Sequence, residues 1–217
     1  MNRFLSITFK TSLALILAFI TLPLLVVLVA SVSPTAKIVF APSLWTTKWY
    51  GALFTSRWID PFLLSVELAL IVTVLSGLFG LLAAFAVAYE KCPGHAAIMS
   101  FLLSPLSVPQ IVKGVAIVLF LSSTGFYGLL GTPGLIIAHV ILTLPFVVRM
   151  IAGAMFNFDK RLDLAARVLG ASKLQRIRYI LLPLIKPGLF SGMTFAFILS
   201  FNNIPLSVFL VRPGETT

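Results

Sequence analysis

Residues 62–89 read FLLSVELALIVTVLSGLFGLLAAFAVAY, and Glu67 is the one charged residue among them. A helix needs about 20 apolar residues, at about 1.5 Å each, to cross the hydrocarbon of a bilayer. This stretch therefore predicts a membrane-spanning helix. The whole chain agrees with it, because 59% of the 217 residues are hydrophobic and 10% are charged, against about 25% charged residues in soluble domains.

Four further stretches have the length and composition of a span, namely residues 13–30, 96–121, 133–156 and 187–210. We therefore expect an all-α fold, a polytopic transmembrane helical bundle of about five spans. The stretch 96–121 contains Pro105 and Pro109, and each proline removes a backbone donor and disrupts a helix. Freed carbonyl groups need partners in lipid, so we expect this segment to face protein or a cavity.

The basic residues between the spans indicate an orientation, because cytoplasmic loops carry an excess of Lys and Arg. With a cytoplasmic N-terminus, ten basic residues fall in inner segments and four in outer ones. The inner residues are Arg3, Lys10, Lys91, Lys160, Arg161, Arg167, Lys173, Arg176, Arg178 and Lys186. The outer residues are Lys37, Lys48, Arg57 and Arg212. The charges therefore predict that the N-terminus is cytoplasmic.

The N-terminal segment, residues 1–33, is predicted to be a retained transmembrane helix. Its apolar run is long for a cleaved signal peptide, and Pro34 follows where cleavage would be expected. Residues 34–61 are then an outer, periplasmic segment. Trp45, Trp49 and Leu53 recur there at helical spacing, which is typical of a helix lying at headgroup depth; a contact surface for an external partner is the alternative.

The inner loop, residues 157–188, is long, basic and patterned. Asp159 is placed to cap a helix, and Gly170 fits the left-handed position that ends one. The apolar face of that helix follows the spacing i, i+3, i+4, i+7; it consists of Leu162, Ala165, Ala166 and Leu169. The loop therefore predicts a short amphipathic helix that ends in a sharp turn.

A second helix is predicted directly after that turn. Ser172 and Gln175 have the spacing of a capping box, and Leu174, Ile177 and Leu181 line one face. Pro183 and Pro187 are expected to stop this helix before the last span begins. A small apolar patch with a basic rim suits insertion into a groove of a partner, or contact with anionic lipid.

The run LDLAARVLGAS at 162–172, followed by LLPLIKPG at 181–188, resembles the EAA loop of ABC importer permeases. These proteins are inner-membrane components of binding-protein-dependent transport systems. The resemblance covers residues from about 62 to the C-terminus and looks closest to the spermidine/putrescine branch. It implies a type-1 transmembrane domain over residues 62–217 in a bacterial inner membrane. In the family, a glutamate precedes the paired alanines; here that place holds Leu164, and Asp163 supplies a carboxylate one residue earlier.

The resemblance also implies partners and a docking site. The partners are a cytoplasmic ATPase subunit dimer, a second permease subunit, identical or different, and a periplasmic solute-binding protein. The docking residues carried over are Leu162, Asp163, Leu164, Ala165, Ala166, Arg167, Leu169 and Gly170. The family core usually has a further span after the fifth one, so either this core is shortened or a partner subunit covers the exposed face.

No catalytic or cofactor site is expected in this sequence. We find no Walker motif, so the ATPase is expected to be a separate chain. Two histidines, six acidic residues and the single Cys92 offer no catalytic dyad, no metal cluster and no cofactor site. The net charge of +10 lies in loops beside spans, which favours contact with membrane lipid over nucleic acid.

Four polar residues inside apolar stretches are candidates for the translocation path, because ionisable groups in spans are costly. They are Lys113, Asn202, Asn203 and Glu67. Lys113 is expected to pair with a carboxylate or a carbonyl group, while the two asparagines can equally join helices. His139 is expected to be a hydrogen-bonded structural residue.

The predicted function is a permease subunit of an ATP-binding-cassette importer for a small solute. The cargo could be polyamine-like, but amino acids, other small solutes and anions are equally open. Asn202 and Asn203 stand where the polyamine branch tends to carry acidic residues, and two neutral amides do not suit a cationic cargo as a carboxylate would. The alternative classes are an ATP-independent channel or secondary transporter, and a membrane enzyme.

Overall fold

The computed structural model describes residues 2–35, 44–90 and 92–211, with side chains from Ser6 onward. Lys37, Lys91 and Arg212, which entered the charge count, lie outside the described residues, as does the side chain of Arg3. The chain divides into two compact units, Met1–Asp60 and Pro61–Thr217. Each unit is described by itself.

The first unit contains α1 (Asn2–Ser31) and the short α2 (Lys48–Ala52). The described side chains of α1, from Ser6 onward, are mainly apolar and mostly exposed, as expected for a span. After α1, the indole Nε1 of Trp49 donates to the carbonyl of Ser33 at 2.7 Å, and the hydroxyls of Ser31 and Tyr50 are 2.8 Å apart. The helix predicted from Trp45 to Leu53 is shortened to the five residues of α2. A helix of nine residues without a packed neighbour is only marginally stable, and Gly51 weakens it further.

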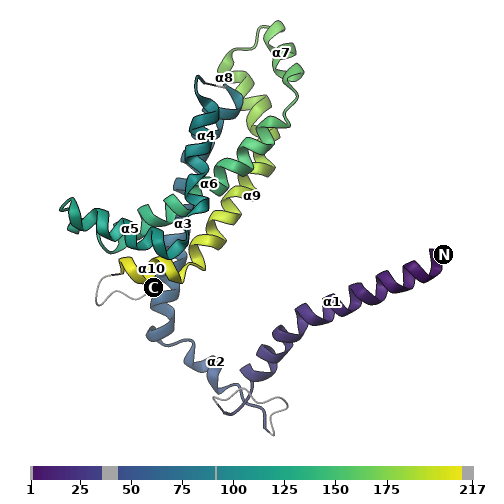
Figure 1. Ribbon diagram of the computed structural model, residues 1–217, viewed down its shortest axis with the longest axis vertical. Helices are drawn as coiled ribbons and strands as arrows, with labels where there is room; N and C mark the ends of the chain where they lie inside the picture. The colour runs from purple at the N-terminus through teal and green to yellow at the C-terminus, as the bar shows by residue number, and fades with distance from the viewer. Residues whose placement is uncertain (1, 36–43, 91, 212–217) are drawn as a thin grey trace. The chain divides into compact units, whose positions relative to one another are not determined.

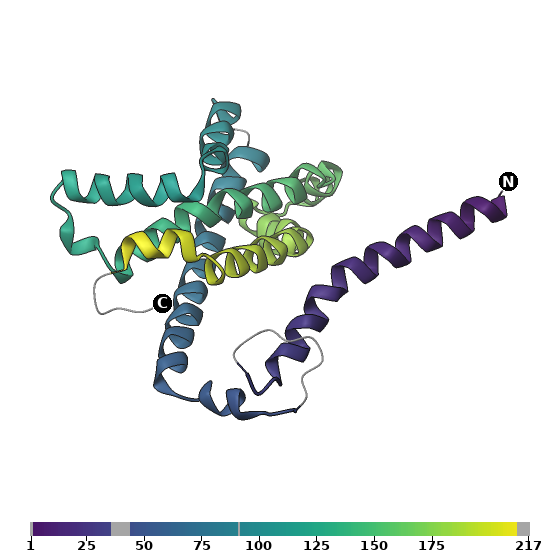
Figure 2. The same ribbon diagram turned by 60° about the horizontal axis from the view of Figure 1, so that its bottom comes forward.

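The second unit is a bundle of helices (Figures 1 and 2). In chain order its elements are α3 (Ser56–Ala84, entering from the first unit), the π-turn η1 (Phe85–Tyr89), α4 (His95–Leu103), η2 (Ser104–Ser107), α5 (Gln110–Ser123), η3 (Tyr127–Leu129), α6 (Thr132–Phe156), α7 (Lys160–Val168), α8 (Lys173–Arg176), the π-turn η4 (Ile177–Leu181), α9 (Leu182–Phe201) and α10 (Ile204–Leu210). The helices α6 and α9 pack along each other (Figure 1).

Four helices of the described chain are long and apolar enough to span a membrane, and a bent pair makes a fifth crossing if it counts as one span. The four are Ser6–Ser31, Ser56–Tyr89, Thr132–Phe156 and Lys173–Phe201. No strand occurs among the described residues. The predicted all-α bundle of transmembrane helices is therefore confirmed.

The span predicted at residues 96–121 is broken. The segments His95–Ser107 and Gln110–Ser123 meet at an angle of 105°. Val108 is extended, with φ −95° and ψ 129°, because the following proline ring excludes the helical conformation. Pro109 then becomes the N-cap of α5.

The prediction for the last span was wrong at both ends. Pro183 and Pro187 do not stop a helix, since the chain stays helical from Lys173 to Phe201. The π-turn η4 accompanies this continuity: the amide of Leu182 donates to the carbonyl of Ile177, five residues back, and Pro183, which has no amide to donate, follows directly. At the other end α9 stops at Phe201, and α10 is a separate helix.

The second unit has two hydrophobic cores. One contains Leu135, Ala138 and Leu142 of α6 with residues of α3, α5 and α10; the other contains Val147, Ile151 and Met155 of α6 with residues of α3, η1, η4 and α9. The helix α6 therefore contributes to both cores in succession. Its contact with α9 is close, because a Cβ added at Gly188 would lie 2.7 Å from Cβ of Ala154.

Candidate functional site: the docking loop and its anchor

The local structure of the loop at residues 157–188 follows from its capping residues. A carboxylate oxygen of Asp159 accepts the amide of Arg161 at 2.9 Å and starts α7. Gly170 has a φ of +85°, which only glycine adopts without strain. Ser172 and Gln175 form the capping box that starts α8, at 3.3 Å and 2.8 Å. These three sequence predictions are confirmed.

The apolar side chains of α7 are exposed. Leu162 and Leu164 are about half exposed, while Val168 and Leu169 at the end of the helix are each 86% exposed. Such a cluster of exposed large apolar side chains indicates a contact surface. Sequence reasoning missed Val168, although its position four residues after Leu164 places both on one side of the helix.

A hollow of about 380 Å³ adjoins these side chains, between the turn at Gly170 and the helix that follows. Leu169 and Gly170 form one wall, and Gln175 and Tyr179 belong to the other. We name a candidate docking surface, which consists of Leu164, Val168, Leu169, Gly170 and Tyr179. It combines exposed apolar side chains with a shallow depression. Exposed apolar side chains on a short helix suit insertion into a groove of a partner.

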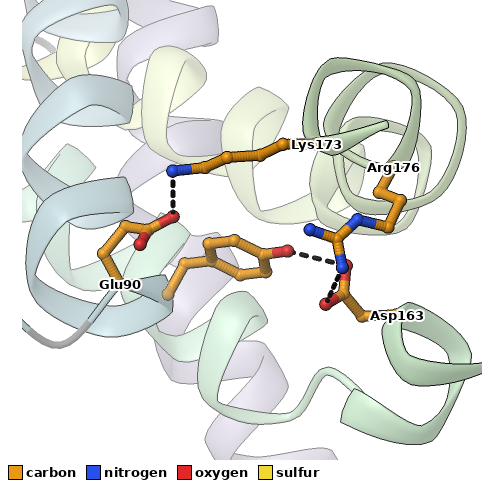
Figure 3. A network of polar contacts seen from close by, with 5 residues as sticks. Glu90, Asp163, Lys173 and Arg176 are labelled. Carbon is orange, nitrogen blue, oxygen red and sulfur yellow. Dashed lines mark hydrogen bonds and ion pairs between the residues drawn. The ribbon is translucent and has the colours of Figure 1, made fainter. Parts of the chain in front are cut away.

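Asp163 holds α7 against the rest of the chain. The hydroxyl of Tyr89, at the end of η1, donates to Oδ1 of Asp163 at 2.8 Å. Arg176 of α8 donates from Nη1 to Oδ2 at 3.0 Å, and Figure 3 shows this pair beside Lys173 and Glu90. The Arg176 and Asp163 side chains are 13% and 22% exposed, so the ion pair is shielded from water. Asp163 was predicted as a docking residue, and both of its oxygens bind within the chain.

A second ion pair lies on the same side of the loop. Nζ of Lys173 is 3.1 Å from Oε1 of Glu90, with side chains 60% and 38% exposed (Figure 3). Pairs this exposed contribute little to stability. The Tyr89–Asp163–Arg176 contact is therefore the main anchor of α7. Beside it, a hollow of about 490 Å³ is lined by the four basic side chains of Lys160, Arg167, Lys173 and Arg176.

The predicted path residues do not form one cluster. Nζ of Lys113 donates to the carbonyl of Pro105 at 3.0 Å, across the bend between η2 and α5. Glu67 is on the exposed side of α3. Asn202 and Asn203 were placed inside the last span, and this was wrong: they occupy the break between α9 and α10, because Asn203 caps α10 through the amide of Leu206 at 3.0 Å.

The side chain of Asn203 also contacts α5, since its Nδ2 donates to Oε1 of Gln110 at 3.2 Å. Asn203 and Lys113 therefore both lie near the start of α5. His139 is buried and hydrogen-bonded to two serines, as expected for a structural histidine. Across the part of the chain that the structure describes, no three His, Cys, Asp or Glu side chains gather as metal ligands.

Comparison with known proteins gives one family match. The model of the family "Binding-protein-dependent transport system inner membrane component" matches residues 76–215. The chain is 28% identical over 205 residues to the putrescine transport system permease protein PotI of Escherichia coli, covering 92% of this chain and 73% of the relative.

Two other relatives are similar over the same extent. Identity is 29% over 203 residues to the spermidine/putrescine transport system permease protein PotC of Escherichia coli, covering 92% and 75% of the two chains. It is 25% over 212 residues to the sulfate transport system permease protein CysT of Salmonella typhimurium, covering 93% and 74%.

Proposed function

The chain belongs to the family of binding-protein-dependent transport system inner membrane components, and from that membership we propose that its docking surface receives a cytoplasmic ATPase subunit. As a member, the chain is a permease subunit of an ABC importer in the inner membrane. Such systems work with an ATPase, a second permease and a binding protein. The proposal concerns which residues of this chain meet the ATPase and how motion reaches the spans.

The exposure of Val168 and Leu169 is the observation that carries this proposal. Both side chains are 86% exposed at the tip of α7, beside a glycine turn. Burying one such side chain in a partner is worth about 1.5–3 kcal/mol. The surrounding basic residues, such as Lys160 and Arg167, keep the loop in water when no partner is bound. A short helix with an apolar tip thus fits the groove of a soluble subunit.

Motion would reach the spans through two connections. On one side, Asp163 ties α7 to Tyr89 at the end of the α3 span. On the other side, α8 continues through η4 into α9 without interruption. A displacement of α7 therefore acts on two spans together, which is what coupling of ATP hydrolysis to transport requires.

The orientation proposed is N-terminus inside, with the docking surface in the cytoplasm where ATP is available. If α4, η2 and α5 cross the membrane once as a bent pair, four spans precede α7. An even number of crossings returns the chain to the side of its N-terminus. The excess of basic residues predicted for this side supports the same orientation.

For the cargo, we propose a polyamine-like solute delivered by a periplasmic binding protein. The relatives named for putrescine and spermidine/putrescine support this choice. Uptake of radiolabelled putrescine and of radiolabelled sulfate, measured side by side in cells that express the complete system, tests it. Putrescine uptake alone is the expected result; uptake of sulfate alone would contradict the polyamine proposal while leaving the permease function intact.

The docking surface is tested by the double variant Val168→Ser and Leu169→Ser in the full chain, expressed with its ATPase subunit. We expect retention of the ATPase on purified permease to fall about tenfold or more, because two buried apolar contacts are lost. The matched control is Phe54→Ser, which removes a side chain that is 79% exposed outside the loop. Wild-type retention in the double variant would overturn the proposed surface.

A further control separates the permease from an ATP-independent channel. An ATPase subunit with an inactivated Walker lysine is expected to assemble normally and to abolish putrescine uptake. Continued uptake in that background would favour the channel or secondary transporter instead.

A further inference from the structure

A buried polar layer lies between the two hydrophobic cores of the second unit. Along α6 the first core ends at Leu142 and the second begins at Val147. Thr143 lies at this boundary, and its hydroxyl donates to the carbonyl of His139, one turn earlier and between Ala138 and Leu142. Other elements bring buried polar groups to the same place. They are Ser76 of α3, Ser200 of α9, Asn203 of the break and Ser207 of α10. Polar groups at this depth need partners inside the protein.

His139 bridges the break between α9 and α10. Its Nδ1 is 2.9 Å from Oγ of Ser200, before the break, and its Nε2 is 3.2 Å from Oγ of Ser207, after it. The side chain is buried, with 1% exposure. One imidazole from α6 therefore holds both sides of the interruption in the last part of the chain.

The hydrogen bonds have a defined direction. Ser207 has one hydroxyl proton, which it donates to the carbonyl of Asn203 at 2.8 Å. Its oxygen must therefore accept from Nε2–H of His139. A neutral imidazole has one donor and one acceptor, so Nδ1 accepts the hydroxyl proton of Ser200. The result is a continuous chain of donors from Ser200 through His139 and Ser207 to the backbone at the break.

The segment beyond the break is tied to a different part of the bundle from α9. Asn203 bonds Gln110 at the start of α5, and the amide of Gly131 donates to the carbonyl of Leu210 at 3.0 Å. Leu206 and Leu210 of α10 belong to the first core, whereas Ile185 and Ala196 of α9 belong to the second. The break thus coincides with the boundary between the cores.

The helix α6 also has a weak point at this boundary. Pro145 lies inside α6, between Leu142 of the first core and Val147 of the second. A proline inside a helix removes one backbone hydrogen bond and allows bending. The break between α9 and α10 and the proline of the continuous helix α6 therefore both lie near the polar layer.

We propose that His139 is a positioning residue for transport, which fixes the angle between α9 and α10 in one state of a hinge at the polar layer. In this proposal the two cores tilt against each other as units, and the bonds to Ser200 and Ser207 hold the resting geometry. The proposal rests on the proposed function, because the ATPase drives the tilt.

The experiment measures the distance across the break by pulsed electron paramagnetic resonance. Spin labels are placed at Phe190→Cys and Val208→Cys, whose side chains are 63% and 67% exposed, in a Cys92→Ser background. The complete transporter is studied in vesicles, first without nucleotide and then with ATP and vanadate. We expect two label-to-label distances in the wild type. The ratio of the populations at these two distances, called the distance ratio below, should change when nucleotide is added.

The variants remove the bridge from either side. Ser200→Ala and Ser207→Ala are each expected to raise the fraction at the second distance about threefold without nucleotide, the typical effect of one interhelical hydrogen bond. His139→Leu is expected to do so more strongly. His139→Gln is expected to restore the wild-type ratio, since an amide also offers one acceptor and a donor.

Ser76→Ala is the matched control. Its hydroxyl is 2.7 Å from that of Thr143 in the same buried layer, but neither residue belongs to α9 or α10. We expect this variant to keep the wild-type distance ratio even where it lowers thermal stability. Equal shifts in Ser76→Ala and Ser207→Ala, or unchanged ratios in both serine variants of the break, would overturn the hinge.

The two levels of the proposal fail differently. A wild-type distance ratio that does not respond to ATP and vanadate contradicts the proposed coupling. The effect of the serine variants without nucleotide still tests His139, because it needs no ATPase activity. If His139→Leu does not assemble, the two serine variants carry the test.

Discussion

The phenolic oxygen of Tyr89 lies 2.8 Å from Oδ1 of Asp163, a residue 74 positions later in the chain. This bond joins the end of the α3 span to the middle of α7. Arg176 binds the other oxygen of the same carboxylate, so three separate segments meet at one charge (Figure 3). The carboxylate therefore sets the position of α7 relative to the spans, while the side chain of Leu164, the next residue, is exposed at the surface.

Tyr89→Phe removes one bond from this carboxylate and keeps the ring. A hydrogen bond to a charged group contributes about 1.5–3 kcal/mol, and partial exposure places this one at the lower end. We expect faster hydrogen exchange of the backbone amides in α7, with little change in α6, as read by mass spectrometry of the full transporter. Tyr50→Phe, which removes the hydroxyl contact with Ser31 and lies outside this loop, is the control, and equal exchange of α7 in the two variants would contradict the anchor.

Gly170→Val tests the turn. A Cβ at Gly170 meets no atom within 4 Å, so the cost comes from the φ of +85°. A left-handed conformation costs a residue with a side chain about 1–2 kcal/mol, which is about tenfold in a binding equilibrium. We expect normal membrane insertion and about tenfold less solute taken up per ATP hydrolysed.

Gly94→Val provides the matched control for this turn. Gly94 has a φ of +74° and equally open surroundings, but it lies before α4. The same strain there should leave coupling unchanged. A similar loss of coupling in both variants would mean that general strain, and not the docking turn, causes the effect.

Gly188→Ala tests the close contact of α6 and α9. The new methyl group would lie 2.7 Å from Cβ of Ala154 and 2.9 Å from the carbonyl oxygen of Met150. Overpacking of this kind costs about 1–3 kcal/mol, so the thermal midpoint of the detergent-solubilised complex should fall. Gly153→Ala has no atom within 4 Å and should keep or raise the midpoint, because alanine favours a helix by about 1 kcal/mol over glycine.

Lys113→Met removes the bond across the bend of the broken span. The ammonium group donates to the carbonyl of Pro105, which also accepts the amide of Val108 at 3.3 Å. We expect about 1 kcal/mol less protection from hydrogen exchange at the start of α5. Lys113→Arg keeps a donor and should preserve most of the protection; unchanged exchange in Lys113→Met would show that the bond does not hold the bend.

Features that depend on nearby residues could be predicted from the sequence. The cap at Asp159, the turn at Gly170 and the capping box at Ser172 each involve positions within a few residues of one another. The existence of the spans follows from composition, because the bilayer sets their length, but the ends of the last span and the break at Pro109 do not. The family resemblance likewise rests on a local run of residues.

Features that depend on distant partners could not be predicted. Nothing near Asp163 in the sequence points to Tyr89, and nothing near His139 points to Ser200 and Ser207. Prolines were the clearest source of error. Pro109 breaks its helix as expected, whereas Pro183 is accommodated by a π-turn that buries Leu181 and Ile185 in the core. Packing, and not propensity, decides between these outcomes.

The uninterrupted helix from Lys173 to Phe201 has a mechanical consequence. Its 29 residues form a rod about 40 Å long. A tilt of about 5° imposed at the Lys173 end displaces the Phe201 end sideways by about 4 Å, by simple leverage over that length. A slight rocking of the first turn of this helix therefore displaces groups at its far end by about the width of a methyl group.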